Sequence, residues 1–167
     1  MLRGCLAWAS RYGFHDVDLN ADQPPNALDA WDEARVRAIL QRCERDDIHA
    51  EVHSLGHPVE ECRYYFDAIA SAHFGWAFTV NHAHLVPEGI AGFLDAFGVT
   101  RIGEVRLADS LGDKEMHLNP GEGSIDFAAL SQRLESSSYP YHYMMAFGSL
   151  EDKLVGRDHL AACWHEA

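Results

Sequence analysis

The sequence predicts an α/β fold in which the strands of a parallel sheet alternate with helices. Short apolar runs recur between longer amphipathic stretches, which is the pattern expected for such an alternation. Residues 75–80 are almost continuously apolar, as in a strand covered on both faces of a parallel sheet. Residues 102–107 form another apolar run and lead into a loop rich in acids and histidines. Because an α/β barrel carries its catalytic groups at such strand ends, we expect a barrel-type sheet with its helices outside.

The N-terminal part of the chain supplies two of the predicted strands. A short helix is expected over residues 5–12, and the alternation of apolar and polar side chains in residues 14–19 predicts a strand. Asp29 or Asp32 can cap the next helix, whose apolar residues recur at helical spacing. Residues 48–52 are the second strand candidate.

The middle of the chain continues the alternation. Pro58 opens a third helix as a proline in the first helical position. The strand at residues 75–80 follows, and then a helix over residues 87–97 that Gly98 ends. The apolar run at residues 102–107 is the fourth strand candidate.

The C-terminal part completes the predicted fold. Ser124 can cap a helix that begins near Ile125 and covers residues 127–134. Residues 142–147 are the fifth strand candidate, and residues 150–163 form the last predicted helix. The sequence therefore predicts about five strands.

Composition and charge limit the partners of the chain. The 167 residues predict a single domain with a substantial core. The formal net charge of −13 argues against nucleic acid and anionic membranes, because both prefer a basic protein surface. No apolar run approaches membrane-spanning length, and residues 1–9 are too short and mixed for a signal peptide. The four cysteines are widely scattered, so we expect reduced thiols and a cytoplasmic location.

Four segments of the chain resemble the xylose-isomerase-like TIM barrels. Residues 107–110, 115–117 and 120–127 resemble the seventh strand and loop of that superfamily, and Asn81-His82-Ala83-His84 stands where an Asp-x-x-His motif follows strand six. The superfamily holds sugar and sugar-phosphate isomerases and epimerases and the related abasic-site endonucleases. The resemblance implies a TIM-barrel-type parallel sheet, and the acidic charge disfavours the endonuclease branch.

The resemblance also implies that the barrel is incomplete, with about five strands instead of eight. The order before residue 48 resembles the start of the superfamily barrel, and the order after residue 59 resembles strands six to eight. We therefore expect one domain over residues 1–167 with an internal deletion near residues 48–59, or a contracted version of the fold. Since an open sheet exposes unpaired edges, a homo-oligomer is predicted.

The superfamily's usual divalent-metal site is expected to be absent. That site takes a Glu, an Asp, a His and a second Glu from the ends of strands five to eight. The resemblance places Asn81, Arg106 and Ala146 at three of these positions, and the strand-five Glu is either missing or Glu51. An amide, a cation and a methyl group are poor partners for a hard cation.

A second set of residues can hold a metal. His84, Glu115 and His117 match positions that some superfamily members use for additional ions. Two imidazoles and a carboxylate suit borderline metals, so the predicted cofactor is a divalent zinc, manganese or magnesium ion, or none. The alternative is that His82 and His84 hydrogen-bond the backbone of their loop, while His117 shapes the turn that follows it.

The resemblance implies a sugar or sugar-phosphate isomerase or epimerase, acting on a small polyol or keto-sugar by proton transfer next to a carbonyl. His84, Glu115 and His117 are the acid–base candidates. The candidate substrate-binding residues are Asn81, Arg106, Asp109 and Glu122. Two of these have competing interpretations, since Arg106 can pair with Asp109 or Glu104, and Glu122 can accept backbone hydrogen bonds. The alternative function is that of a degraded barrel serving as a binding or oligomerising module.

Overall fold

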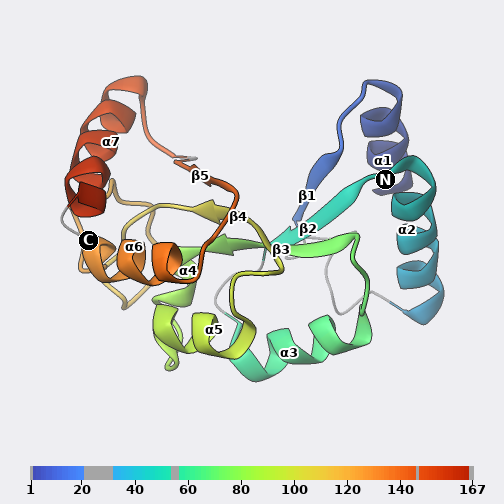
Figure 1. Cartoon of the computed structure of the whole chain (residues 1–167), viewed down its shortest axis with the longest axis horizontal. Coiled ribbons are helices and arrows are strands. Elements are labelled where there is room, and N and C mark those ends of the chain that lie inside the picture. Colours follow the sequence, from blue (N-terminus) through green and yellow to red (C-terminus); the bar gives the residue numbers. More distant parts are fainter. Residues whose placement is uncertain (1, 21–31, 54–56, 146, 166–167) are drawn as a thin grey trace. The chain divides into compact units, whose positions relative to one another are not determined.

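The computed structural model describes residues 2–20, 32–53, 57–145 and 147–165. Its five parallel strands follow one another in the sheet in chain order, β1-β2-β3-β4-β5, with helices between them (Figure 1). The strands are β1 (Asp16–Asn20), β2 (His49–His53), β3 (Phe74–Thr79), β4 (Ile102–Arg106) and β5 (His142–Met144). This confirms the predicted fold class, an incomplete TIM-barrel-type α/β sheet.

The chain divides into two compact units, and the boundary falls within β3. Unit 1 comprises residues 1–55 and 60–77, and unit 2 comprises residues 56–59 and 78–167. The single domain with a deletion near residues 48–59 stays a prediction. None of the described helices has both the length and the apolar character needed to cross a bilayer.

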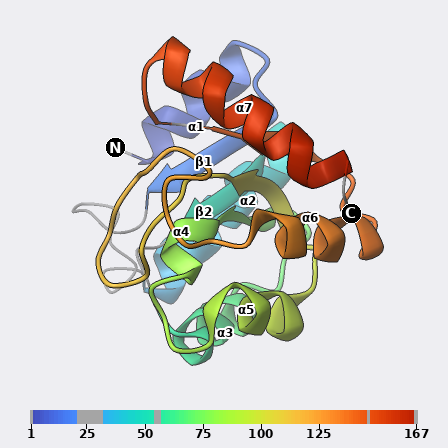
Figure 2. The ribbon, with the colours of Figure 1, turned by 90° about the vertical axis from the view of Figure 1, so that its left-hand side faces the viewer.

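Unit 1 is built around an apolar cluster between two helices and two strands. Helices α1 (Leu2–Arg11) and α2 (Glu33–Asp46) pack together beside β1 and β2 (Figures 1 and 2), and α3 (Val59–Ala68) follows β2 in the chain. The parallel register pairs Asp16 with His49 at one end of β1 and Asn20 with His53 at the other. The buried cluster consists of Leu6, Ala9, Ile39, Cys43, Ile48 and Ala50.

The start of α2 confirms one of the two predicted caps. Asp32 precedes the helix in an extended conformation, and its side chain accepts a 2.7 Å hydrogen bond from the backbone N–H of Arg35. This is the geometry by which an aspartate satisfies an otherwise unpaired donor of the first turn. Asp29, the alternative cap, lies outside the described residues.

Unit 2 carries helices α4 (Val80–Ala83), α5 (Gly89–Phe97), α6 (Phe127–Ser136) and α7 (Leu150–His165). Strand β5 pairs with β4 in parallel, with Glu104 opposite His142 and Arg106 opposite Met144. Helices α6 and α7 lie side by side (Figures 1 and 2). A 3.2 Å hydrogen bond from Trp164 Nε1 to Glu135 Oε1 links the two helices.

Two local predictions in unit 2 were wrong. Ser124 does not cap α6, because Asp126 does so by accepting a 2.9 Å hydrogen bond from the N–H of Ala129. Residues that follow β3 form the helical turn α4 instead of a loop. This turn matters for the site, because successive residues of a helix point in directions about 100° apart.

Candidate functional site

The carboxylate of Asp109, which is 1% exposed, stabilises the conformation of the loop between β4 and α6. Its two oxygens accept backbone hydrogen bonds from Ser110 at 2.8 Å, Gly121 at 3.0 Å, Gly123 at 2.9 Å and Ile125 at 3.1 Å. A Cβ atom on Gly123 would lie 2.3 Å from Asp109 Oδ1, so this close approach requires glycine. These four donors account for the buried carboxylate, and a substrate-binding role for Asp109 stays a prediction.

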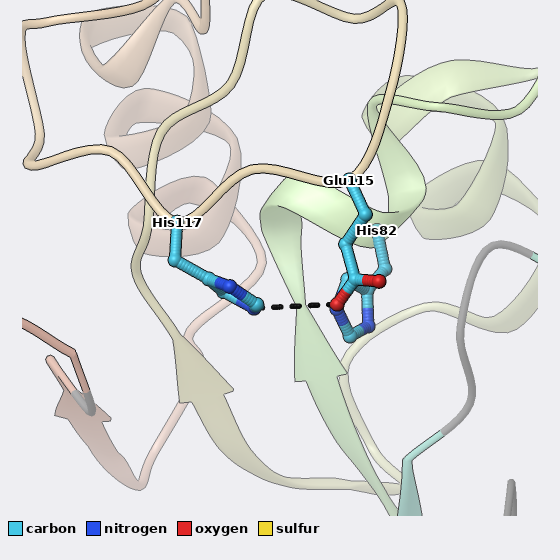
Figure 3. Close-up of side chains that lie close together, drawn as sticks. All are labelled: His82, Glu115 and His117. Carbon is cyan, nitrogen blue, oxygen red and sulfur yellow. Dashed lines mark ion pairs between the residues drawn. The ribbon is translucent and has the colours of Figure 1, made fainter.

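This loop places Glu115 and His117 close to His82, which lies on α4 directly after β3. His82 Nε2 is 3.7 Å from Glu115 Oε1, and His117 Nε2 is 3.6 Å from the same oxygen. Figure 3 shows the carboxylate of Glu115 over the ring of His82, with the ring of His117 facing it. His82 is buried, whereas Glu115 and His117 are exposed. The group therefore has one protected and two accessible side chains.

The spacing of these three side chains fits a metal ion. Their candidate ligand atoms all lie within 4.8 Å of one another. Ligands about 2.1 Å from a tetrahedral ion are about 3.4 Å apart, close to the two separations to Glu115 Oε1. Three protein ligands leave a fourth position for water or substrate, as catalytic zinc sites do. Because two of the ligands are imidazoles, the group suits zinc or manganese better than magnesium.

His84, which the sequence proposed as the first ligand, is placed elsewhere. Its Nε2 atom is 3.0 Å from the hydroxyl of Ser124, and a Cβ atom on Gly112 would lie 3.0 Å from the same nitrogen. The structure thus groups Glu115 and His117 with His82 instead of His84. The sequence offers two histidines in this motif, and the helical turn α4 decides which one lies beside Glu115 and His117.

Asn81 connects α4 to the same loop. Its side chain is fully buried and donates a 2.9 Å hydrogen bond from Nδ2 to the backbone carbonyl of Met116. Met116 lies between Glu115 and His117, so this bond fixes the segment that carries both candidate ligands. Among the described residues, Asn81 Oδ1 is a buried acceptor with no hydrogen-bond partner. Sequence reasoning missed the positioning role, because it assigned Asn81 to the substrate.

Arg106 forms an ion pair with Glu104, one of the two partners that the sequence suggested. Its Nε atom lies 2.5 Å from Glu104 Oε1, and the two side chains are 13% and 14% exposed. The other oxygen of Glu104 is 3.3 Å from His142 Nε2 on the neighbouring strand. Glu104 therefore compensates the guanidinium charge that would otherwise repel a cation bound nearby.

Glu122 lies beside a small cavity that borders on His117. Its Oε2 atom accepts a 3.0 Å hydrogen bond from the N–H of Asn119, which confirms the expected contact with a backbone donor. The cavity has a volume of about 160 Å³. It is lined by Leu107, Ala108, His117, Leu118, Asn119, Pro120, Glu122, Met145, Phe147, Gly148 and Asp152. Its lining thus takes in the residues that follow β4 and β5, the edge at which parallel sheets bind ligands.

Two residues from the superfamily's usual metal site cannot be placed in this geometry. Ala146 and the side chain of Glu51 lie outside the described part of the chain. The backbone of Glu51 pairs with Gly75 in the register between β2 and β3. Its assignment to a strand-five position stays a prediction.

Comparison with known proteins identifies the fold. No family model matches the chain, and no curated protein sequence matches it either. A D-tagatose 3-epimerase-like protein matches 98% of this chain and 67% of its own, with 18% identity and a TM-score of 0.79. A Thermus thermophilus protein soaked with zinc chloride matches 99% of this chain and 68% of its own, at 17% identity and a TM-score of 0.74.

A xylose isomerase domain protein from Planctomyces limnophilus has the same TM-score of 0.79, at 12% identity, over 99% of this chain and 63% of its own. The chain therefore spans about two thirds of the length of the solved structures that it matches. At these identities the likeness shows the fold alone.

Proposed function

We propose that this chain, which has the fold of the xylose-isomerase-like TIM barrels over about two thirds of their length, is a metal-dependent sugar isomerase or epimerase. The observation that carries the proposal is the group of His82, Glu115 and His117, located next to a small polar cavity. The name of the first similar structure, a D-tagatose 3-epimerase-like protein, supports the same reaction class. The substrate class is a small polyol, keto-sugar or sugar phosphate.

The proposed metal site consists of the two Nε2 atoms and the Glu115 carboxylate. A divalent ion bound there would supply a Lewis acid for a substrate oxygen next to the reacting carbon. The buried amide of Asn81 keeps Glu115 and His117 in place through the carbonyl of Met116. Such outer contacts commonly change metal affinity by about 10–100-fold. The zinc chloride named for the Thermus thermophilus structure supports a metal of this kind in the fold.

His84 is the proposed acid–base residue, because Glu115 and His117 would be engaged by the metal. The hydroxyl of Ser124 lies 3.0 Å from His84 Nε2 and also donates a 3.2 Å hydrogen bond to the carbonyl of Ser110. These contacts fix the orientation of the imidazole, which proton transfer requires. Glu122 is proposed to accept a hydrogen bond from a substrate hydroxyl at the cavity.

A non-catalytic binding or oligomerising module is the second candidate. It is favoured by the ion pair of Arg106 with Glu104, which occupies a strand end where the superfamily carries a ligand histidine. Strands β1 and β5 are at the two ends of the strand order, and such edges can pair with a second copy of the chain. The homo-oligomer, the cytoplasmic location and the absence of nucleic-acid binding stay predictions.

Calorimetry with Zn²⁺ and Mn²⁺ tests the metal site. His82→Ala should weaken binding by about 100-fold or more, because it removes one of three ligands. His84→Ala is the matched control from the same motif and should bind the ions as the wild type does. Loss of binding in the His84 variant alone would contradict the proposed ligand set.

Proton exchange separates the enzyme from the binding module. The metal-loaded wild type should incorporate deuterium from D₂O into a ketohexose at the carbon next to the carbonyl, as observed by NMR. His84→Ala should lower the exchange rate by about 10²–10⁴-fold, the usual contribution of an acid–base residue. Tight metal binding without any exchange would favour the non-catalytic module.

A further inference from the structure

We propose that Glu122 and Asp152 make the cavity beside His117 selective for uncharged polyhydroxy substrates and exclude phosphate esters. The inference rests on the proposed function, and it decides between the two substrate classes that the fold leaves open. Glu122 and Asp152 would contact parts of the substrate that the proposed metal ion does not bind.

The polar lining of the cavity contains acceptors and no cationic side chain. Its polar side chains belong to His117, Asn119, Glu122 and Asp152, and the described lining residues include neither lysine nor arginine. Sugar hydroxyls can donate to the two carboxylates and to the amide oxygen of Asn119. A phosphate group would bring further negative charge against these two carboxylates, and no lysine or arginine of the described lining would compensate it. The proposed metal ion would be present with either compound and is therefore common to both.

Both carboxylates are held in place by backbone donors. Glu122 accepts from the N–H of Asn119 at 3.0 Å, and Asp152 Oδ2 accepts from the N–H and the hydroxyl of Ser149, both at 2.8 Å. The bonds from the Ser149 backbone and side chain lower the pKa of Asp152, so its negative charge is retained at neutral pH. These contacts orient both carboxylates at the cavity.

Arg106, one of the candidate substrate-binding residues, is engaged by Glu104. Its guanidinium is paired with Glu104 at 2.5 Å, and both side chains are largely buried. An anion would have to compete with this carboxylate to recruit the arginine. Arg106 does not line the cavity, and its guanidinium is committed to an internal ion pair.

The remaining lining suits the apolar face of a sugar. The rings of His117 and Phe147 lie with their centroids 3.8 Å apart, and Leu107 and Met145 also border the cavity. Its volume of about 160 Å³ lies below the roughly 300–1,000 Å³ typical of drug-sized ligands, which fits a small substrate. Carboxylates, an amide and aromatic rings together provide the acceptors and the apolar surface that a neutral monosaccharide requires.

Calorimetry with D-fructose and D-fructose 6-phosphate on the Mn²⁺-loaded wild type tests the inference. We expect D-fructose to bind at least about tenfold more tightly than its phosphate ester, since like charges disfavour the ester. In Glu122→Gln and Asp152→Asn, the affinity for the ester should rise while that for D-fructose falls. Both substitutions keep an oxygen for the backbone donors and remove the charge. Glu151→Gln, which removes an exposed acid of α7 outside the cavity lining, is the matched control and should change neither affinity.

The outcomes distinguish this inference from the proposed function. Binding of the ester by the wild type as tightly as D-fructose would overturn the inference and leave the isomerase proposal intact. An equal rise in ester affinity in Glu151→Gln would also overturn it, because the effect would then come from net charge alone. If neither compound binds the metal-loaded protein, the proposed function fails, and the inference fails with it.

Discussion

The two units of the molecule bury different kinds of side chain. In unit 1, the buried residues among those described are apolar, and one cluster of them contains Leu6, Ile39 and Ile48. The buried polar or charged residues of the described chain all belong to unit 2. They are Thr79, Asn81, His82, Asp109, Ser110 and Ser131. The apolar interior of unit 1 stabilises the fold, whereas unit 2 also holds polar groups in fixed positions.

This difference places the buried polar groups in unit 2, which also holds the proposed metal site. A buried polar group costs free energy unless it finds a partner. Asp109 has four backbone donors, but Thr79 Oγ1, Asn81 Oδ1 and Ser110 Oγ are buried without a hydrogen-bond partner in the described part of the chain. Such departures from the rule are expected near functional sites, where a ligand can supply the missing partner.

The largest expected effect on stability is that of Asp109→Ala. The substitution leaves the N–H groups of Ser110, Gly121, Gly123 and Ile125 without their acceptor, so we expect a loss of about 3–5 kcal/mol in the free energy of unfolding. Urea unfolding should show a lower midpoint with an unchanged slope.

Asp109→Asn is the control that keeps the size of the side chain and removes its charge. It keeps one acceptor oxygen at the same place and should lose about half as much stability. If Asp109→Ala instead left the unfolding midpoint unchanged and abolished sugar binding, Asp109 would be the substrate-binding residue that the sequence suggested. Asp109 would then be assigned to substrate binding instead of to the structure of the loop.

An apolar truncation in unit 1 should affect stability and leave the metal site intact. Leu6 is fully buried in the cluster between α1, α2, β1 and β2, and Leu6→Ala should cost about 3 kcal/mol through lost contacts and a cavity. Zn²⁺ affinity of the folded protein should not change, because His82, Glu115 and His117 belong to unit 2. A matched loss of metal affinity, measured by calorimetry below the unfolding transition, would show that the two units are coupled.

The sequence predicted the alternation of strands and helices because that alternation follows from local periodicity and capping residues. Apolar runs identified β3 and β4, and Asp32 was one of two candidate caps suggested by residue type and position. The group of side chains that could hold a metal ion contains two of the three residues that the sequence suggested, while their role as ligands stays a prediction. The resemblance suggested Glu115 and His117. The choice between His82 and His84 depends on the helical turn α4, which the sequence of the motif did not predict.

Contacts between distant segments also escaped prediction. The hydrogen bond of Asn81 with Met116 joins residues far apart in the sequence, and so do the bonds from Gly121 and Gly123 to Asp109. A residue type alone cannot tell whether a buried carboxylate or amide faces a ligand or the protein's own backbone. Such roles follow from the fold of the loop, and the structure was needed to assign them.

The smallest effect that we predict concerns the start of α7. Ser149 precedes the helix and exchanges hydrogen bonds with Asp152, since its N–H and hydroxyl donate to Asp152 Oδ2, and its hydroxyl accepts from the Asp152 N–H at 3.1 Å. This reciprocal cap satisfies donors of the first turn. Ser149→Ala should lower the melting temperature at pH 7 by about 2–4 °C, as expected for loss of one capping hydroxyl in a protein of this size.

The pH dependence of this loss follows from the sign of the pKa shift. Hydrogen bonds from the backbone and hydroxyl of Ser149 lower the pKa of Asp152. The stabilisation is therefore fully present above the ordinary carboxyl pKa of about 3.9 and declines as the pH falls through the lower value of the folded state. Thermal unfolding should show a difference between Ser149→Ala and wild type that shrinks below about pH 4. Ser136→Ala, which removes an exposed hydroxyl bonded to the carbonyl of Arg133, should show no such trend. A difference that persists unchanged at low pH would mean that the hydroxyl stabilises α7 without the charge of Asp152.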